Sequence, residues 1–93
     1  MLVRTVHLTV TGRVQGVAYR AWAVRTAADL ELRGWVRNRL DGSVEALVSG
    51  NDAEVAAMIE ACRRGPLAAR VAELRVVEAE DDGSAGFETR PTV

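Results

Sequence analysis

The sequence has no lysine, because all twelve of its basic residues are arginine. A chain without lysine cannot form a Schiff base through a side-chain amine, and it cannot use the lysine of a nucleotide-binding phosphate loop. The single histidine, His7, excludes a metal site built from several histidines. The single cysteine, Cys62, excludes an internal disulfide and a paired-cysteine metal site. These absences remove several kinds of chemistry before any motif is considered.

Long hydrophobic runs, aromatic residues and excess charge are also scarce. No apolar run approaches the roughly 20 residues that a membrane-spanning helix needs, and the first residues have no signal-peptide core. Aromatic residues make up 4% of the 93 residues and the net charge is −1, so neither a nucleic-acid nor a membrane partner is expected. The composition favours one globular domain over residues 1–93, acting as a monomer in the cytoplasm.

The pattern of apolar residues predicts an alternation of strands and helices. Alternating side chains indicate half-buried strands, and apolar residues three and four positions apart indicate helices. Strands are expected over residues 3–11, 34–40, 44–49, 71–79 and 87–90, and helices over 20–32 and 52–64. Asp41-Gly42 predicts a hairpin turn. The order β-α-β-β-α-β predicts an α+β, ferredoxin-like α/β sandwich, with two helices on one face of an antiparallel sheet and a short extra C-terminal strand.

The two helices have different sequence signals. The first is rich in alanine, and its predicted buried face consists of Val24, Ala27, Ala28 and Leu32. The second has a clearer apolar stripe, formed by Val55, Met58, Ile59 and Cys62. We expect Asn51 to cap the second helix, with Glu54 completing a capping box, and Gly65-Pro66 to end it.

Two of the strands carry more specific expectations. Val36, Asn38 and Leu40 share one side of the second strand, and the apolar pair predicts that this side faces the helices. In the strand over 71–79, Val71 and Leu74 are three residues apart, so a bulge is expected there.

The segment between the first strand and the first helix has the character of a phosphate site. It reads Gly-Arg-Val-Gln-Gly-Val-Ala-Tyr-Arg over residues 12–20. Glycines let the backbone turn several N–H groups inward as an anion cradle, and the helix adds the positive end of its dipole. Arg20, on the first turn, offers a planar fork of donors suited to phosphate oxygens. Such a loop is by itself more often a simple turn, so a second motif is needed to decide.

The second motif is Gly-Trp-Val-Arg-Asn over residues 34–38, followed by Gly42, Val44 and Gly50. Together the two motifs resemble the acylphosphatase family, which carries Gly-x-Val-Gln-Gly-Val-x-Phe-Arg and Gly-Trp-Val-x-Asn-x-x-x-Gly-x-Val. The resemblance continues through Gly65-Pro66 and the Phe-x-x-Arg over residues 87–90, and it covers essentially the whole chain.

The resemblance implies a function and a set of site residues. It implies an acylphosphatase, which hydrolyses the carboxyl–phosphate bond of acyl phosphates without a metal or other cofactor. By position, Arg20 corresponds to the catalytic arginine of the family and Asn38 to its catalytic asparagine. The implied phosphate-binding residues are Arg13, Val14, Gln15, Gly16, Val17, Ala18, Tyr19 and Arg20.

Two residues depart from the family pattern. Tyr19 stands where phenylalanine is usual, and we expect its extra hydroxyl to lie near the loop. Glu31 stands where glycine is common, and we expect it to affect only local stability.

The chemistry implied by the family suits the residues present. An acyl phosphate leaves as a carboxylate with a pKa of about 4, so the leaving group needs no general acid. Water can then attack phosphorus in line, provided that the protein orients the water and neutralises the phosphate oxygens. Arg20 and the loop N–H groups suit the second task, and the Asn38 carbonyl suits the first.

Other polar residues are expected to be structural. They are His7 on the polar strand face, Cys62 in the core, Trp35 in packing, Arg37 and Arg39 paired with Glu45, and Asp81-Asp82 in a turn. Thr92 is expected to support the hydrogen-bond network of the site.

Alternative functions on the same element order are less well supported. An RNA-recognition module needs aromatic residues on its central strands, and a metal chaperone needs paired cysteines. A regulatory module that binds phosphate without turnover has no reason to keep both Arg20 and Asn38. A domain from a larger carbamoyl-transferring protein is a further alternative, and a chain of 93 residues that starts with methionine favours the free-standing enzyme.

Overall fold

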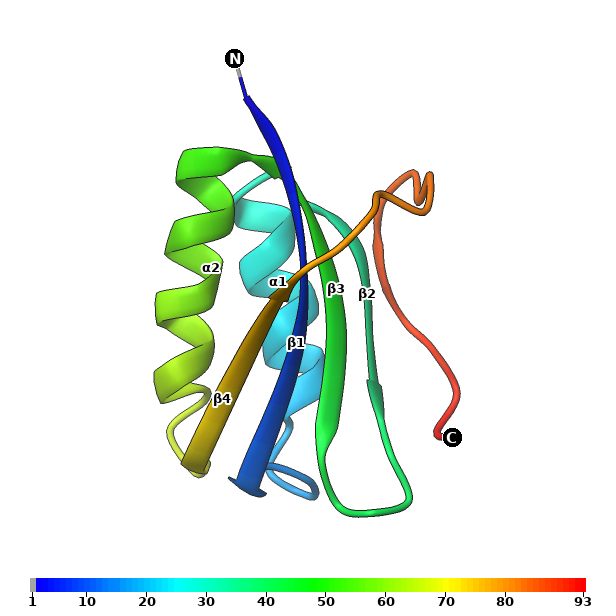
Figure 1. Ribbon diagram of the computed structural model, residues 1–93. Coiled ribbons are helices and arrows are strands. Elements are labelled where there is room, and N and C mark those ends of the chain that lie inside the picture. Colours follow the sequence, from blue (N-terminus) through cyan, green and yellow to red (C-terminus); the bar gives the residue numbers. More distant parts are fainter. Residues whose placement is uncertain (1) are drawn as a thin grey trace.

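The computed structural model describes residues 2–93, which form five strands and two helices (Figure 1). In chain order these are β1 Val3–Arg13, α1 Tyr19–Asp29, β2 Arg33–Asn38, β3 Val44–Asn51, α2 Asp52–Arg64, β4 Arg70–Glu78 and β5 Phe87–Thr89. The sheet order is β4-β1-β3-β2-β5, and both helices pack on one face of the sheet (Figure 1). The predicted ferredoxin-like α+β fold is confirmed, and the short extra strand β5 runs parallel to β2.

The core lies between the sheet and the helices. On β1, Val6, Leu8 and Val10 are at most 1% exposed, as the alternation predicted. From α2, Val55 and Met58 pack against the same face and are also fully buried. Each such side chain stabilises the fold by about 1.5–3 kcal/mol relative to exposure, so this packing determines which face of every strand points inward. Neither helix in residues 2–93 has the combined length and hydrophobicity needed to cross a membrane.

Helix α2 follows its prediction closely. Asn51 is the N-cap, and its side chain accepts a hydrogen bond from the Ala53 N–H. Glu54 Oε2 is buried and has no hydrogen-bond partner within residues 2–93, so this oxygen does not complete the expected capping box. Arg63 and Arg64 occupy the last turn, where positive charge offsets the negative end of the helix dipole.

Helix α1 is shorter than predicted. It ends at Asp29 rather than at residue 32, because Glu31 takes a left-handed backbone conformation with a φ of 57°. Ala28 was expected on the buried face but is exposed, and Ala23 is buried instead. Leu32 is buried as expected, although it lies beyond the helix. Alanine side chains are small enough for either face of a helix, which is why the pattern misled here.

The prediction for Leu40 is wrong. Strand β2 ends at Asn38, and Leu40 lies in the hairpin turn with 88% of its surface exposed. The turn is stabilised locally, since Asp41 Oδ1 accepts hydrogen bonds from both the backbone N–H and the hydroxyl of Ser43. This side-chain interaction closes the turn at Asp41-Gly42 and removes Leu40 from the strand.

The expected bulge in β4 is confirmed. The pairing of β1 with β4 shifts between Thr11 and Gly12, where Ala72 is the extra residue. A side chain at Gly12 would collide with the Arg70 carbonyl oxygen and the Ala72 nitrogen, so only glycine fits this close approach.

The face of the sheet opposite the helices carries a charged network centred on Glu45. Glu45 accepts hydrogen bonds from Arg37 Nε at 2.7 Å and Arg39 at 3.2 Å, as predicted, and it also bonds His7 Nε2 at 2.6 Å. His7 is therefore half-buried on this face rather than freely exposed. Trp35 lies beneath the Arg37 guanidinium, 4.6 Å from the ring centroid, and is buried in packing as expected.

The backbone conformation of Glu31 generates a stability prediction. A non-glycine residue in the left-handed region costs about 1–2 kcal/mol, part of which glycine loses again through its greater freedom in the unfolded chain. We expect Glu31→Gly to raise the free energy of unfolding by about 0.5–1 kcal/mol in urea denaturation. The control Ala57→Gly, on the exposed face of α2, should lower it by about 1 kcal/mol. A loss of stability in Glu31→Gly would contradict the assigned strain.

The Glu45 network generates a pH prediction. Burial raises the pKa of Glu45, but the hydrogen bonds from Arg37, His7 and Arg39 outweigh burial and hold the pKa below its ordinary value of 4.5. A carboxyl with a lowered pKa contributes stability above its unfolded-state pKa and loses that contribution as the pH falls through the folded-state value. Glu45→Gln should therefore destabilise the protein at pH 7, and this difference should shrink below about pH 4.5. An equal difference at pH 7 and pH 3 would contradict this account.

Candidate active site

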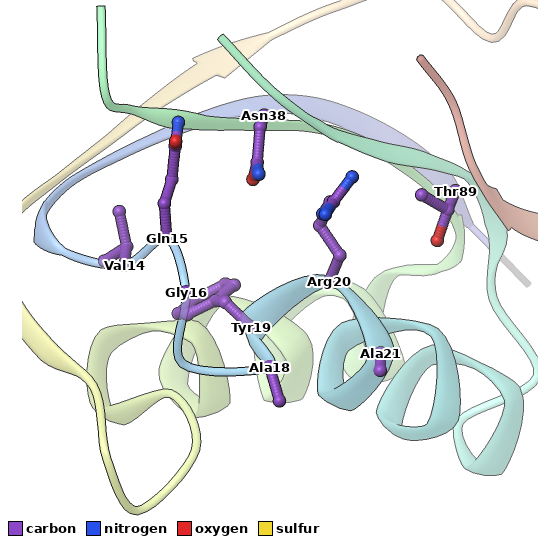
Figure 2. A pocket seen from close by; sticks show the side chains of 9 residues that line it. All are labelled: Val14, Gln15, Gly16, Ala18, Tyr19, Arg20, Ala21, Asn38 and Thr89. Carbon is purple, nitrogen blue, oxygen red and sulfur yellow. The ribbon is translucent and has the colours of Figure 1, made fainter. Parts of the chain in front are cut away.

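A pocket of about 330 Å³ lies at one end of the sheet, where the loop after β1 meets the start of α1 and the end of β2. Its lining residues come from the loop, α1, β2 and β5 (Figure 2). They are Val14, Gln15, Gly16, Ala18, Tyr19, Arg20, Ala21, Asn38 and Thr89. The pocket therefore brings together both residues that the family motifs single out, Arg20 and Asn38.

Strand direction explains why these two residues meet. Strands β1 and β2 are each antiparallel to β3, which lies between them, so β1 and β2 run the same way. Their carboxyl ends therefore lie at the same end of the sheet. Val10 pairs with Val44, and Val44 pairs with Asn38, so the three residues form one row across the sheet. Since Val10 and Val44 face the helices, Asn38 faces them too, as predicted.

The loop backbone contains two residues in the left-handed conformation. Gly16 has a φ of 71°, and Ala18 has a φ of 63° although it carries a side chain. A left-handed residue other than glycine is strained and is most often retained where function requires the conformation. Ala18 also forms the N-cap of α1, and its carbonyl accepts the first helical bond, from Trp22 N.

Within residues 2–93, the N-terminus of α1 has neither a side-chain cap nor an acidic residue in its first turn. The first backbone N–H groups of a helix have no partner within the helix, and together with the dipole they attract an anion. Helix α2 differs, because Asn51 caps it and Asp52 and Glu54 lie in its first turn. The start of α2 is therefore already capped and neutralised, whereas the start of α1 is open to an anion.

Arg20 lies on the first turn of α1 and is half-buried. Figure 2 shows its guanidinium reaching across the pocket toward β2, with Asn38 on one side and Thr89 on the other. Within residues 2–93, Arg20 forms no ion pair. Its positive charge is thus available to a ligand.

A second hollow, between α2 and strands β1 and β4, contains no arginine that is free of an ion pair. Its two arginines, Arg4 and Arg63, are each paired with a carboxylate, Arg4 with Glu78 at 2.8 Å and Arg63 with Glu60 at 3.2 Å.

Asn38 has a rigid backbone and an uncommitted side chain. It pairs with Val44 on β3, and its carbonyl accepts a hydrogen bond from Val93 N on the other side. Its Oδ1 is buried and has no hydrogen-bond partner within residues 2–93. Figure 2 shows the amide directed into the space between Gln15 and Arg20. A buried carbonyl oxygen without a partner is unfavourable by about 1–3 kcal/mol, so its presence in a pocket favours a water or ligand partner.

The remaining loop residues have distinct positions. Gln15 lines the pocket, and its side-chain Nε2 donates to the carbonyls of Arg39 and Ser43 at 2.8 Å each. Arg13 is the last residue of β1 and Val17 is buried in the core, and neither is among the residues that line the pocket.

The Tyr19 hydroxyl has a structural partner that the sequence did not indicate. It donates a hydrogen bond of 2.6 Å to the Cys62 carbonyl in α2, so it ties the two helices together. Burial raises the pKa of Tyr19, so the hydroxyl stays protonated and keeps this bond. Cys62 lies in the core as predicted, and burial raises the pKa of its thiol to about 11.

The sequence did not point to two lining residues, Ala21 and Thr89. Thr89 reaches the pocket because β5 lies beside β2, a pairing that no local pattern indicates. Thr92, which was expected to support the site, is exposed and does not line the pocket.

The lining residues limit the chemistry of the pocket. Among them are no histidine, cysteine, serine or carboxylate, and the only hydroxyls are those of Tyr19 and Thr89.

Asp81 and Asp82 form the expected turn, accepting from Gly83 N and Ser84 N. Residues 2–93 contain no group of three or more His, Cys, Asp or Glu side chains that could hold a metal ion.

Comparison with known proteins agrees with this geometry. The family model for acylphosphatases matches residues 6–89. The acylphosphatase of Rhodospirillum rubrum is 50% identical over 90 residues, which cover 97% of this chain and 99% of the relative.

Solved structures point to the same family. An acylphosphatase from Coxiella burnetii superposes with a TM-score of 0.91 at 32% identity, over 95% of this chain and 93% of that one. The acylphosphatase from Bacillus subtilis gives a TM-score of 0.90 at 32% identity, over 96% and 99% of the two chains. The family expected from the two motifs is confirmed, and this chain belongs to the acylphosphatase family of hydrolases, which act on acyl phosphates.

Proposed function

We propose that this enzyme cleaves the carboxyl–phosphate bond by in-line attack of a water molecule on phosphorus, without a metal ion or other cofactor. In this mechanism Arg20 and the backbone N–H groups of residues 13–20 hold the phosphate, and Asn38 orients the water. The observation that carries the proposal is the buried Asn38 Oδ1, which has no hydrogen-bond partner within residues 2–93, on a residue that shares the pocket with Arg20.

The phosphate side of the proposal depends on charge. An acyl phosphate carries negative oxygens, and its transition state spreads charge over the three equatorial oxygens. The free N–H groups at the start of α1, the left-handed loop around Gly16 and the unpaired Arg20 together provide donors for those oxygens. These donors are in place before the substrate arrives, so they require little reorganisation during the reaction.

The water side of the proposal depends on geometry. An attacking water needs an acceptor for one of its hydrogens and must stand opposite the leaving carboxylate. Rotation of the Asn38 amide about its last torsion can present Oδ1 to the pocket, because no hydrogen bond within the described residues holds this oxygen. Asn38 belongs to a paired strand, so the water would be held by a rigid element rather than by a loop.

The leaving group explains why the pocket needs no acid. The departing carboxylate has a pKa of about 4, so it leaves without a proton from the enzyme. A pocket whose lining residues include no histidine or carboxylate can therefore support the reaction.

The proposal extends to the oligomeric state, the location and the partners of the enzyme. Residues 1–93 act as one acylphosphatase-like domain, a monomer in the cytoplasm that acts on small acyl phosphates without a nucleic-acid or membrane partner. The net charge of −1 and the 4% content of aromatic residues support the absence of a nucleic-acid or membrane partner.

The experiment that tests the mechanism follows the loss of benzoyl phosphate with EDTA-treated protein and two alanine variants. Asn38→Ala should lower kcat about 10²–10³-fold, because it removes the group that orients the water. Arg20→Ala should lower kcat/KM at least as much and should also weaken inhibition by inorganic phosphate, since it removes the charged fork. The matched control Arg25→Ala, an exposed arginine on the same helix, should stay within about threefold of the wild type.

Two results would contradict the mechanism. Wild-type activity in a folded Asn38→Ala variant would remove the proposed water-orienting group. Binding of inorganic phosphate without any turnover by the wild type would make the chain a non-catalytic phosphate-binding module.

A further inference from the structure

The side chain of Gln15 links the loop after β1 to the β2–β3 hairpin. Its Nε2 donates one hydrogen to the Arg39 carbonyl and the other to the Ser43 carbonyl, each at 2.8 Å. Both hydrogens of the amide nitrogen are therefore used. In this arrangement the Gln15 side chain has no N–H left to donate to a phosphate oxygen.

The two acceptors lie in the hairpin, one position beyond the Asn38–Val44 pair. Arg39 directly follows Asn38, the last residue of β2, and Ser43 directly precedes Val44, the residue that pairs with Asn38 across the sheet. Gln15 thus contacts both chains of the hairpin at the point where the strand that carries Asn38 ends. Figure 2 shows the Gln15 side chain extending from the loop up to this hairpin, beside Asn38.

The hairpin does not need Gln15 in order to close. Arg39 N donates to the Ser43 carbonyl at 2.9 Å, and Gly42 N donates to the Arg39 carbonyl at 3.0 Å. Each carbonyl that Gln15 contacts therefore has a second donor from the hairpin itself. Loss of the Gln15 amide would leave the hairpin formed and its carbonyls bonded. It would break only the connection between the hairpin and the loop after β1.

The loop has few other side-chain connections at this point. Gly16 and Ala18 both have left-handed backbone conformations, and both are exposed. Val14 and Val17 anchor the loop in the core, and the stretch between them is held to the β2–β3 hairpin by the Gln15 side chain.

We infer that Gln15 is a positioning residue, which fixes the distance between the phosphate-binding loop and Asn38. The inference rests on the proposed function, because it assigns to Gln15 the alignment of the bound phosphate with the water held by Asn38. A displacement of about 1 Å between such groups is enough to lower a rate about 10²-fold. Gln15 acts through the hairpin and the loop and does not itself contact the reacting atoms.

The first test compares turnover with phosphate binding in Gln15→Met, which keeps the length of the side chain and removes both donors. The variant should fold, and its kcat should fall about 10–100-fold because the water and the phosphate lose their alignment. Its inhibition constant for inorganic phosphate should stay within about threefold of the wild type, because Arg20 and the N–H groups still hold the anion. A parallel loss of phosphate affinity would overturn the inference and make Gln15 a direct phosphate ligand.

A matched control separates alignment from general loosening of the hairpin. Asp41→Ala removes the two bonds from Ser43 that close the turn, but leaves both acceptors of Gln15 in place. We expect this variant to be less stable, with kcat within about threefold of the wild type. An equal loss of kcat in Asp41→Ala and Gln15→Met would overturn the inference.

The second test is a double-mutant cycle with Asn38→Ala. If Gln15 acts by aligning Asn38, its removal should change kcat less than about threefold in the Asn38→Ala background. A full 10–100-fold loss in that background would mean that the two residues act independently, and the inference would fail. Failure of the proposed function is a different result, since it would appear as wild-type activity in Asn38→Ala itself, whatever Gln15 does.

Discussion

Apolar packing between the sheet and the two helices constrains every other feature of this protein. Val6, Leu8, Val10 and Val44 are buried on the same face of the sheet, so a shift of one residue in the pairing would turn them all to the opposite face. The register of β1, β3 and β2 is therefore held by core packing. The same register places Asn38 in one row with Val10 and Val44, at the end of the sheet where the loop begins. The pocket forms because the core requires this alignment.

One face of β2 lines the pocket, and the opposite face bonds to β3 through charged side chains. On the helix-facing side, Asn38 keeps its amide free within the pocket. On the other side, Arg37 and Arg39 bond to Glu45 and hold β2 against β3. This separation lets the strand be stabilised by charged bonds without placing a competing carboxylate near the phosphate. The C-terminal residues add a further restraint, since Val93 N donates to the Asn38 carbonyl.

Much of the fold could be predicted because it depends on patterns that are local in the sequence. Alternation indicated the buried face of β1, and the stripe from Val55 to Cys62 indicated α2. The end of α1 could not be predicted, because alanines give a weak pattern and because the turn at Glu31 takes a conformation unusual for glutamate. Leu40 was misplaced because the bonds within the Asp41 turn outweigh the alternation that would have continued the strand.

For the site, motifs indicated individual residues but not their contacts. The two family motifs pointed to Arg20 and Asn38, and the structure brings both residues to one pocket, while their catalytic roles stay predictions. The Tyr19 hydroxyl, the Gln15 amide and Thr89 could not be interpreted in the same way. Their contacts lie on α2, the hairpin and β5, which are distant in the chain and adjacent only after folding.

The most direct test of the account is a titration of ¹⁵N-labelled protein with inorganic phosphate, followed by NMR. The account predicts saturable shifts in the backbone amides of the residues from Gln15 to Arg20, in the Arg20 Nε–H and in the Asn38 side-chain amide. The start of α2, where Asn51, Asp52 and Glu54 already occupy the first turn, should not respond. Shifts confined to another surface, such as the hollow beside Arg4 and Arg63, would contradict the claim that the α1 loop and Asn38 form one phosphate site.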